Sequence, residues 1–151
     1  MFLCRGIHSR NQFYPMAGIF PFEIVLGPKP QGHGYTIMEC VNPNPFFKRG
    51  ATIRGHEFHY SRIVEKIDPE SYPFAFKLKK GHGIVAGWDG ACYKNVLAGY
   101  SHLHAAGNED WADAMIAAAG SYRRNRNVMS ADSRMDPERV PRESQGYPTV
   151  Y

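Results

Sequence analysis

Histidines are concentrated at two places in this sequence, and the imidazole is the side chain best suited to exchange protons near neutral pH. The first place is the segment 55–61, which reads Gly-His-Glu-Phe-His-Tyr-Ser. If it forms a strand, the period of two places Glu57 and His59 on one face and His56 on the other. A carboxylate beside an imidazole can fix the tautomer of the ring and raise its basicity. This segment therefore contains a candidate acid–base pair.

The second place lies close to residue 100, where His102 and His104 would share one side of an extended segment. A zincin site is excluded, because the first group is one residue short of the HExxH helix motif. Three interpretations remain compatible with the spacing: a zinc site that combines both groups, structural histidines held by hydrogen bonds, and acid–base catalysis with a nucleophile from elsewhere. The zinc site would use four side chains, namely His56, His59, His102 and His104.

The other candidate nucleophiles and metal ligands are three cysteines, Cys4, Cys40 and Cys92. Their number is odd, they are widely spaced and they form no CxxC pair. This pattern argues against a disulfide framework and against a zinc ribbon. We expect three reduced thiols, some of them buried in the core.

Short strands should position these residues. Runs of β-branched and aromatic residues predict strands at 18–26, at 35–41, within 51–65 and at 74–80. The segments 84–88 and 92–101 favour a hairpin whose turn is Asp89-Gly90, a good type I′ pair. The apolar residues 1–3 are interpreted as the middle of an element, with a helix as the first choice.

One long helix is predicted in the second half. Asn108 can cap its start, and Arg123, Arg124 and Arg126 suit its C-terminal end. Its apolar residues fall on one stripe, interpreted as a core face: Trp111, Ala114, Met115, Ala118 and Ala119. No apolar period continues beyond about residue 127. We expect a folded domain over residues 1–126 and a disordered or loosely docked tail over residues 127–151.

The composition is that of one ordinary globular domain, with 151 residues, 43% hydrophobic and 21% charged. The net charge of +4 is spread over the body and the tail, which argues against a nucleic-acid-binding face. No apolar run approaches the roughly 18 residues of a membrane span, and no leader opens the chain. We expect a cytoplasmic protein with neither a nucleic-acid nor a membrane partner.

Four segments form an ordered set: Met-Ala-Gly-Ile-Phe-Pro (16–21), Gly-His-Gly-Tyr-Thr (32–36), Arg-Gly-His-Glu-Phe-His-Tyr-Ser (54–61) and Asn-Val-Leu-Ala-Gly-Tyr-Ser-His-Leu-His (95–104). In this order they resemble the glutamine amidotransferase part of the cobyrinic acid a,c-diamide synthase family. The third segment is the most specific of the four. The resemblance covers residues 1–122.

The resemblance implies an α/β fold, namely a flavodoxin-like sandwich related to class I glutamine amidotransferases, truncated here at its N-terminus. In this family a cysteine on a strand-to-helix elbow attacks glutamine and a histidine activates the thiol. The released ammonia amidates an acetate side chain of a corrin precursor. A separate ATP-binding domain, with magnesium, activates that carboxylate.

By this resemblance His102, in its Tyr-x-His context, matches the catalytic histidine, which takes the thiol proton and returns one to the leaving ammonia. Glu57 and His59 match the middle motif and would line the same hollow as His102, with His56 beside them. His104 is the second choice as the catalytic residue.

Two departures from the family pattern bear on activity. The family nucleophile lies in Glu-Cys-Gly-Gly, followed by one residue and Met-Tyr-Leu. Residues 1–3, Met-Phe-Leu, match the last piece, so the nucleophile would precede Met1 and none of the three cysteines replaces it. No GxxxxGK[ST] phosphate loop occurs either. ATP and magnesium are therefore expected in a domain outside this chain, and no cofactor on the chain itself.

The resulting hypothesis is the amidotransferase part of cobyrinic acid a,c-diamide synthase, with glutamine, a tetrapyrrole carboxylate and the ATP-binding domain as partners. Relatives that amidate sirohaem remain an alternative substrate choice. The second alternative is a non-catalytic, amidotransferase-like module that binds a tetrapyrrole or a partner subunit and lacks the nucleophilic cysteine.

Overall fold

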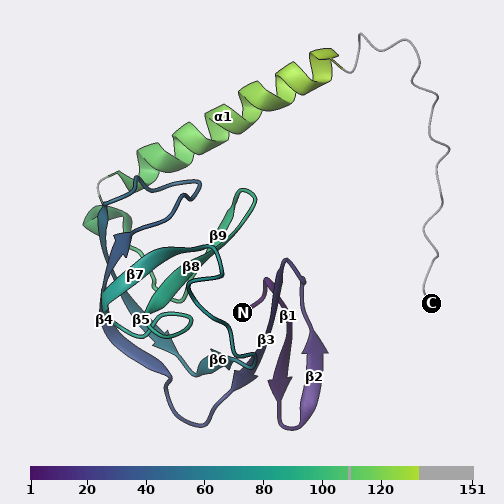
Figure 1. The fold of residues 1–151 in the computed structure, drawn as a ribbon, viewed down its shortest axis with the longest axis vertical. Coiled ribbons are helices and arrows are strands. Elements are labelled where there is room, and N and C mark those ends of the chain that lie inside the picture. The colour runs from purple at the N-terminus through teal and green to yellow at the C-terminus, as the bar shows by residue number, and fades with distance from the viewer. Residues whose placement is uncertain (109, 133–151) are drawn as a thin grey trace, which may run out of the picture. The chain divides into compact units, whose positions relative to one another are not determined.

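The structure is a computed structural model that describes residues 1–108 and 110–132. The strands, shown in Figure 1, are β1 (Cys4–Ser9), β2 (Gln12–Pro15), β3 (Phe20–Leu26), β4 (Gly32–Cys40), β5 (Thr52–His59), β6 (Ser61–Ile63), β7 (Phe74–Lys80), β8 (Trp88–Tyr93) and β9 (Val96–Ala98). A 3₁₀ turn, η1 (Ala105–Gly107), and the helix α1 (Trp111–Asp132) follow them. The chain divides into two compact units, residues 1–116 and 117–151, and both sheets belong to the first.

The smaller sheet has the order β2-β1-β3-β6. Its strands β1 and β3 run parallel, whereas the other two pairs are antiparallel. Strand β3 alternates buried and more exposed residues, as a half-buried strand should, and places Phe20, Phe22 and Ile24 in a common core with Cys4 and Phe74.

The larger sheet has the order β5-β4-β7-β8-β9 and is antiparallel throughout. A second core lies against it, formed by Met38, Cys40, Ile53, Ala75 and Phe76. The long β4–β5 pairing, in which Gly34 lies opposite Glu57, carries the first histidine group.

This five-stranded sheet curls until its two edges meet. His102 follows the end of β9, at one edge, by four residues and forms an isolated antiparallel bridge with His56 of β5, at the other edge. Four residues of extended chain reach at most roughly 14 Å, whereas in a flat sheet a partner on the free edge of β5 would lie five strand spacings, about 24 Å, from β9. The bridge can therefore form only because the sheet is strongly curved (Figure 1).

The strands predicted in the central part of the chain are confirmed, with shifted ends. Segments 18–26 and 74–80 correspond to β3 and β7, and the region 51–65 contains both β5 and β6. The strand predicted at 35–41 begins three residues earlier, at Gly32. Gly32 and Gly34, which lie in this extension, pair in register with His59 and Glu57.

The predicted hairpin has its turn in another place. Asp89 and Gly90 lie inside β8, and β8 turns into β9 through Lys94 and Asn95. Lys94 adopts a left-handed φ of 51°, which such a two-residue turn requires. Asp89-Gly90 does not form the turn. The Asp89 side chain is buried, whereas the residues of a hairpin turn are exposed to solvent.

The beginning of the chain also differs from the prediction. Residues 1–3 lead into strand β1 and not through a helix. Strand β1 forms a hairpin with β2 through Arg10 and Asn11, whose φ values of 50° and 62° are those of a primed turn. The turn has no glycine to announce it, which is why the sequence did not indicate this hairpin.

The helix predicted after Asn108 is present as α1 and continues to Asp132, past the expected end near residue 126. Its stripe was wrongly interpreted as a core face, because Trp111 and Met115 are exposed. The part of the expected tail beyond Asp132 lies outside the described residues. Among the described helices none has the length and hydrophobicity needed to cross a membrane. The class is mixed α/β, as expected.

Candidate active site

His102 is held by its backbone at the closure of the curled sheet. Its N–H donates to the carbonyl of His56 at 2.7 Å, and its carbonyl accepts the N–H of His56 at 3.1 Å. Residues directly opposite in such a pair project to the same side, and the two imidazole centroids are 4.8 Å apart. Both side chains are exposed. His102 therefore presents its ring to solvent from a fixed backbone, which suits a proton-transfer role.

Gly55 makes room for this closure. A Cβ at position 55 would lie 2.6 Å from the His102 carbonyl oxygen and 3.1 Å from the Leu103 side chain. Leu103 packs against the second core, while its neighbours His102 and His104 are exposed. The close approach explains why a glycine precedes the histidine group.

Glu57 is buried on the opposite face of β5 from His56, as the period of two predicts. Its carboxylate accepts the backbone N–H of His82 at 2.6 Å and that of Gly83 at 2.9 Å. Burial opposes ionisation, but the hydrogen bonds from Gly83 and His82 outweigh it and lower the pKa of Glu57. This carboxylate anchors the turn that follows β7.

His59 lies beside Glu57 on the buried face. Its Nδ1 hydrogen-bonds the Ser61 carbonyl at 2.9 Å, so Nδ1 carries the proton, and its Nε2 is 3.5 Å from a Glu57 carboxylate oxygen. The ring stacks on Tyr100, with centroids 3.8 Å apart and planes at 5°. The Tyr100 hydroxyl is 2.6 Å from the Ser61 hydroxyl, and burial raises the pKa of Tyr100 to about 12.

The structure thus separates the predicted site residues into two groups. His56 and His102 lie together on the exposed side, whereas Glu57 and His59 lie on the buried side. The expectation that Glu57 and His59 line the same hollow as His102 does not hold, because β5 runs between them. The four-histidine zinc site fails for the same reason, and no cluster of three or more possible ligands occurs among the described residues.

His104 has a local structural contact. It caps η1, and its Nδ1 accepts the Ala106 N–H at 3.2 Å. The side chain is exposed and does not take part in the closure made by His102. This contact favours a capping role for His104, the second choice as the catalytic histidine.

None of the three thiols resembles an activated nucleophile. Cys4 and Cys40 are buried and Cys92 is half-buried. Burial raises the pKa of all three, which disfavours the thiolate needed for attack. Cys4 belongs to the core of the smaller sheet, and Cys40 to that of the larger one.

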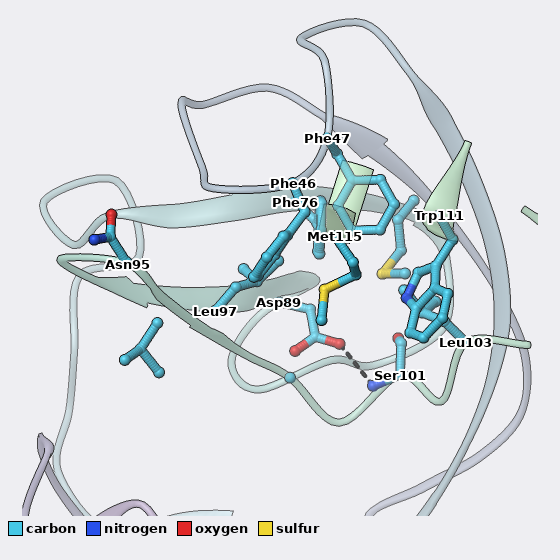
Figure 2. A pocket seen from close by; sticks show the side chains of 13 residues that line it. Phe46, Phe47, Phe76, Asp89, Asn95, Leu97, Ser101, Leu103, Trp111 and Met115 are labelled. Atoms are coloured by element: carbon cyan, nitrogen blue, oxygen red, sulfur yellow. Dashed lines mark hydrogen bonds between the residues drawn. The ribbon is translucent and has the colours of Figure 1, made fainter. Parts of the chain in front are cut away.

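A mostly apolar cavity of about 420 Å³ opens against the larger sheet, and Figure 2 shows its lining. Core residues such as Met38, Phe76 and Leu97 form much of the wall, and Trp111 and Met115 contribute from the start of α1. None of the histidines lines it. Ser101 and Leu103, the two neighbours of His102, do line it, so the cavity adjoins the closing segment without receiving the His102 imidazole.

Asp89, which its sequence context predicted to lie in a turn, is buried. Its side chain reaches the wall of the cavity (Figure 2) and accepts hydrogen bonds from the backbone just before His102. The sequence offers only the pair Asp89-Gly90 at this position, and this pair is typical of an exposed turn, so it does not indicate a buried carboxylate. Only the pairing of β8 with both neighbouring strands places this carboxylate inside.

Comparison with known proteins gives a consistent result. The family model of the CobB/CobQ-like glutamine amidotransferase domain matches residues 1–110. A cobyrinate a,c-diamide synthase from Methanosphaera stadtmanae is 42% identical over 106 residues, which are 70% of this chain and 22% of the relative. One from Magnetococcus marinus is 39% identical over 97 residues, 64% of this chain and 20% of the relative. One from Methanocaldococcus jannaschii is 37% identical over 102 residues, which are 68% of this chain and 22% of the relative.

The matched region thus spans about a fifth of the length of these curated relatives. It contains both histidine groups, the Asp89 segment and all three cysteines. The match covers well over half of the chain. The chain belongs to the CobB/CobQ-like glutamine amidotransferase domain family.

Proposed function

We propose that this chain supplies part of a glutamine amidotransferase that releases ammonia for the ATP-dependent amidation of corrin carboxylates. The observation that carries this proposal is His102, an exposed imidazole on a backbone bonded at both its N–H and its carbonyl. A general base must come within hydrogen-bond reach of the thiol whose proton it takes, and its own position must be fixed. Family membership and the similarity to cobyrinate a,c-diamide synthases support the corrin substrate.

In this proposal His102 takes the proton of a cysteine thiol, and the thiolate attacks the glutamine carboxamide. The imidazolium then gives its proton to the leaving ammonia. The His56 ring lies beside that of His102, with the centroids 4.8 Å apart and the planes tilted by 53°. Glu57 and His59 act from the buried face by holding β5 and the turn after β7 in place.

In this proposal the nucleophilic cysteine is none of the three cysteines of this chain. The tetrapyrrole carboxylate is activated in another part of the enzyme. ATP and magnesium would act on an ATP-binding domain, with which the amidotransferase must exchange ammonia. The finer expectation of a flavodoxin-like domain is part of the same proposal, and the parallel pair β1–β3 is compatible with such a sheet. Sirohaem amidation rests on the same carboxylate chemistry, so the two tetrapyrroles are both candidate substrates.

A non-catalytic binding module is the second candidate. The buried thiols with raised pKa favour it, because a chain that acted alone would have no thiolate for His102 to activate. Such a module would bind a tetrapyrrole without hydrolysing glutamine. Equilibrium binding of each tetrapyrrole to the 151-residue chain, measured by absorbance, is the observation that would favour it.

The enzyme proposal can be tested in a chimera in which residues 1–110 replace the matching segment of the Methanosphaera relative. With glutamine and ATP, mass spectrometry should detect conversion of acid to amide on the corrin substrate or on sirohaem. His102→Ala should lower glutamine-dependent turnover by about 10²–10⁴-fold, the usual effect of losing a general base. Amidation with added ammonia should persist, because free ammonia bypasses the thiol chemistry.

His104→Ala is the matched control, since it removes a nearby exposed imidazole that only caps η1. Its glutamine-dependent turnover should stay near that of the unmodified chimera. Equal losses in the two variants, or full activity of His102→Ala, would contradict the role given to His102.

A further inference from the structure

Asp89 is a buried carboxylate that the proposed reaction steps do not use. Only 1% of the residue is exposed. Its Oδ1 accepts the N–H of Gly90 at 2.9 Å and that of Tyr100 at 3.0 Å, and its Oδ2 accepts the N–H of Ser101 at 2.9 Å. Two of these donors immediately precede His102 in the chain.

The carboxylate acts where the strand ladder ends. The β8–β9 pairing runs from Tyr93 and Val96 to Ala91 and Ala98. Beyond Ala98 the chain leaves the ladder, and the backbone N–H groups of Tyr100 and Ser101 lose the main-chain acceptors of β8. Asp89 supplies the acceptors in their place, and one residue later His102 bonds to His56.

Gly99 lets the backbone lie directly against this carboxylate. A Cβ at position 99 would lie 2.8 Å from Oδ1 of Asp89 and 3.1 Å from its Cγ. A side chain there would therefore push the segment 99–101 off its support. The contact restricts the position of the backbone more closely than the hydrogen bonds alone.

Burial raises the pKa of Asp89, while the three backbone N–H donors oppose this shift. An ionised carboxylate in this place is thus a cost to folding that an apolar side chain would avoid. A charged residue in an otherwise apolar core is often one that a functional site requires. The segment that this one organises is the one that leads to the proposed general base.

We propose that Asp89 is a positioning residue for His102: its carboxylate fixes the backbone of residues 99–101 and thereby the direction in which the imidazole faces the reacting thiol. The inference rests on the proposed function of His102. Tyr100 links the two sides of the site, because the backbone that Asp89 holds also carries the ring stacked on His59.

The first test uses the 151-residue chain and does not depend on activity. Asp89→Asn keeps the size of the side chain but places an amide NH₂ against a backbone donor. Amide hydrogen exchange at Tyr100 and Ser101, measured by NMR, should become about tenfold faster or more, as expected when hydrogen bonds to a charged group are lost. Asp68→Asn is the matched control, because Asp68 also accepts a backbone N–H, from Glu70, but is exposed. Unchanged exchange in Asp89→Asn would overturn the inference.

The second test uses the chimera described above. Asp89→Asn should lower kcat with glutamine by about 10- to 100-fold, consistent with a misplaced catalytic group, and should leave the KM for glutamine and the ammonia-dependent rate nearly unchanged. Gly99→Ala keeps the charge and should reproduce the kcat loss if Asp89→Asn fails to fold. Loss of the ammonia-dependent rate as well, or an unchanged kcat in the variant that folds, would overturn the positioning role. If His102→Ala keeps full glutamine-dependent activity, the proposed function fails. If His102→Ala loses this activity but Asp89→Asn keeps its kcat, only the inference about Asp89 is overturned.

Discussion

At the scale of single residues, two buried carboxylates, Glu57 and Asp89, support the histidine segments, and their pKa values are shifted in opposite directions. Glu57 receives two backbone N–H donors and ionises more readily than a free glutamate, whereas burial makes Asp89 harder to ionise. Both hold backbone that lies close to the candidate site. The exposed His56 and His102 are positioned by the backbone bridge between them, whereas the buried His59 stacks on Tyr100.

Glu57→Gln should lower the free energy of unfolding by about 1–3 kcal/mol, because the amide NH₂ would leave a buried backbone N–H without an acceptor. Glu39→Gln is the control, since Glu39 forms a partly exposed ion pair with Lys79 and should change the free energy by less than about 1 kcal/mol. Chemical denaturation at pH 7 measures both. Equal effects in the two variants would contradict the anchoring role.

The lowered pKa of Glu57 adds a pH dependence. Its stabilising contribution is present above the pKa of an unfolded glutamate, about 4.3, and is lost as the pH falls through the lower pKa of the folded state. The same denaturation series at acidic pH should therefore show a smaller loss of stability in Glu57→Gln than in the unmodified chain.

At the scale of elements, the closure of the five-stranded sheet decides where the candidate base lies. The bridge between His56 and His102 joins two edges that are distant in strand order. Gly55, on the other face of β5 from His56, lets the closing segment approach. The closure is therefore sensitive to one methyl group.

Gly55→Ala should destabilise the chain by about 1–3 kcal/mol, the usual cost of an overpacked contact, because the new Cβ meets the His102 backbone oxygen. The NMR signals of His56 and His102 should shift together. Gly107→Ala is the control, since a Cβ there meets nothing within 4 Å. A melting temperature of Gly55→Ala equal to that of Gly107→Ala would show that the closure tolerates the methyl group.

At the scale of the whole molecule, residues 1–116 contain both sheets and all the candidate site residues. The matched family region ends at residue 110, inside this unit. A chain that ends at residue 116 should therefore unfold in one cooperative transition. Its melting temperature should lie within a few degrees of that of the 151-residue chain. Circular dichroism melting measures this, and loss of the cooperative transition would contradict an independent first unit.

What the sequence determined by itself is local. The period of two correctly separated Glu57 and His59 from His56, and the β-branched runs located the central strands, because both depend only on neighbours along the chain. The ordered motifs were sufficient for the family.

The tertiary structure decided which segments meet. It paired His102 with His56 and not with Glu57 and His59, and it buried Asp89 under the backbone that leads to His102. Strand order and sheet curvature arise from contacts between residues far apart in the chain. Alternation within one strand carries no information about them, which is why the partners of His102 could not be predicted from its spacing.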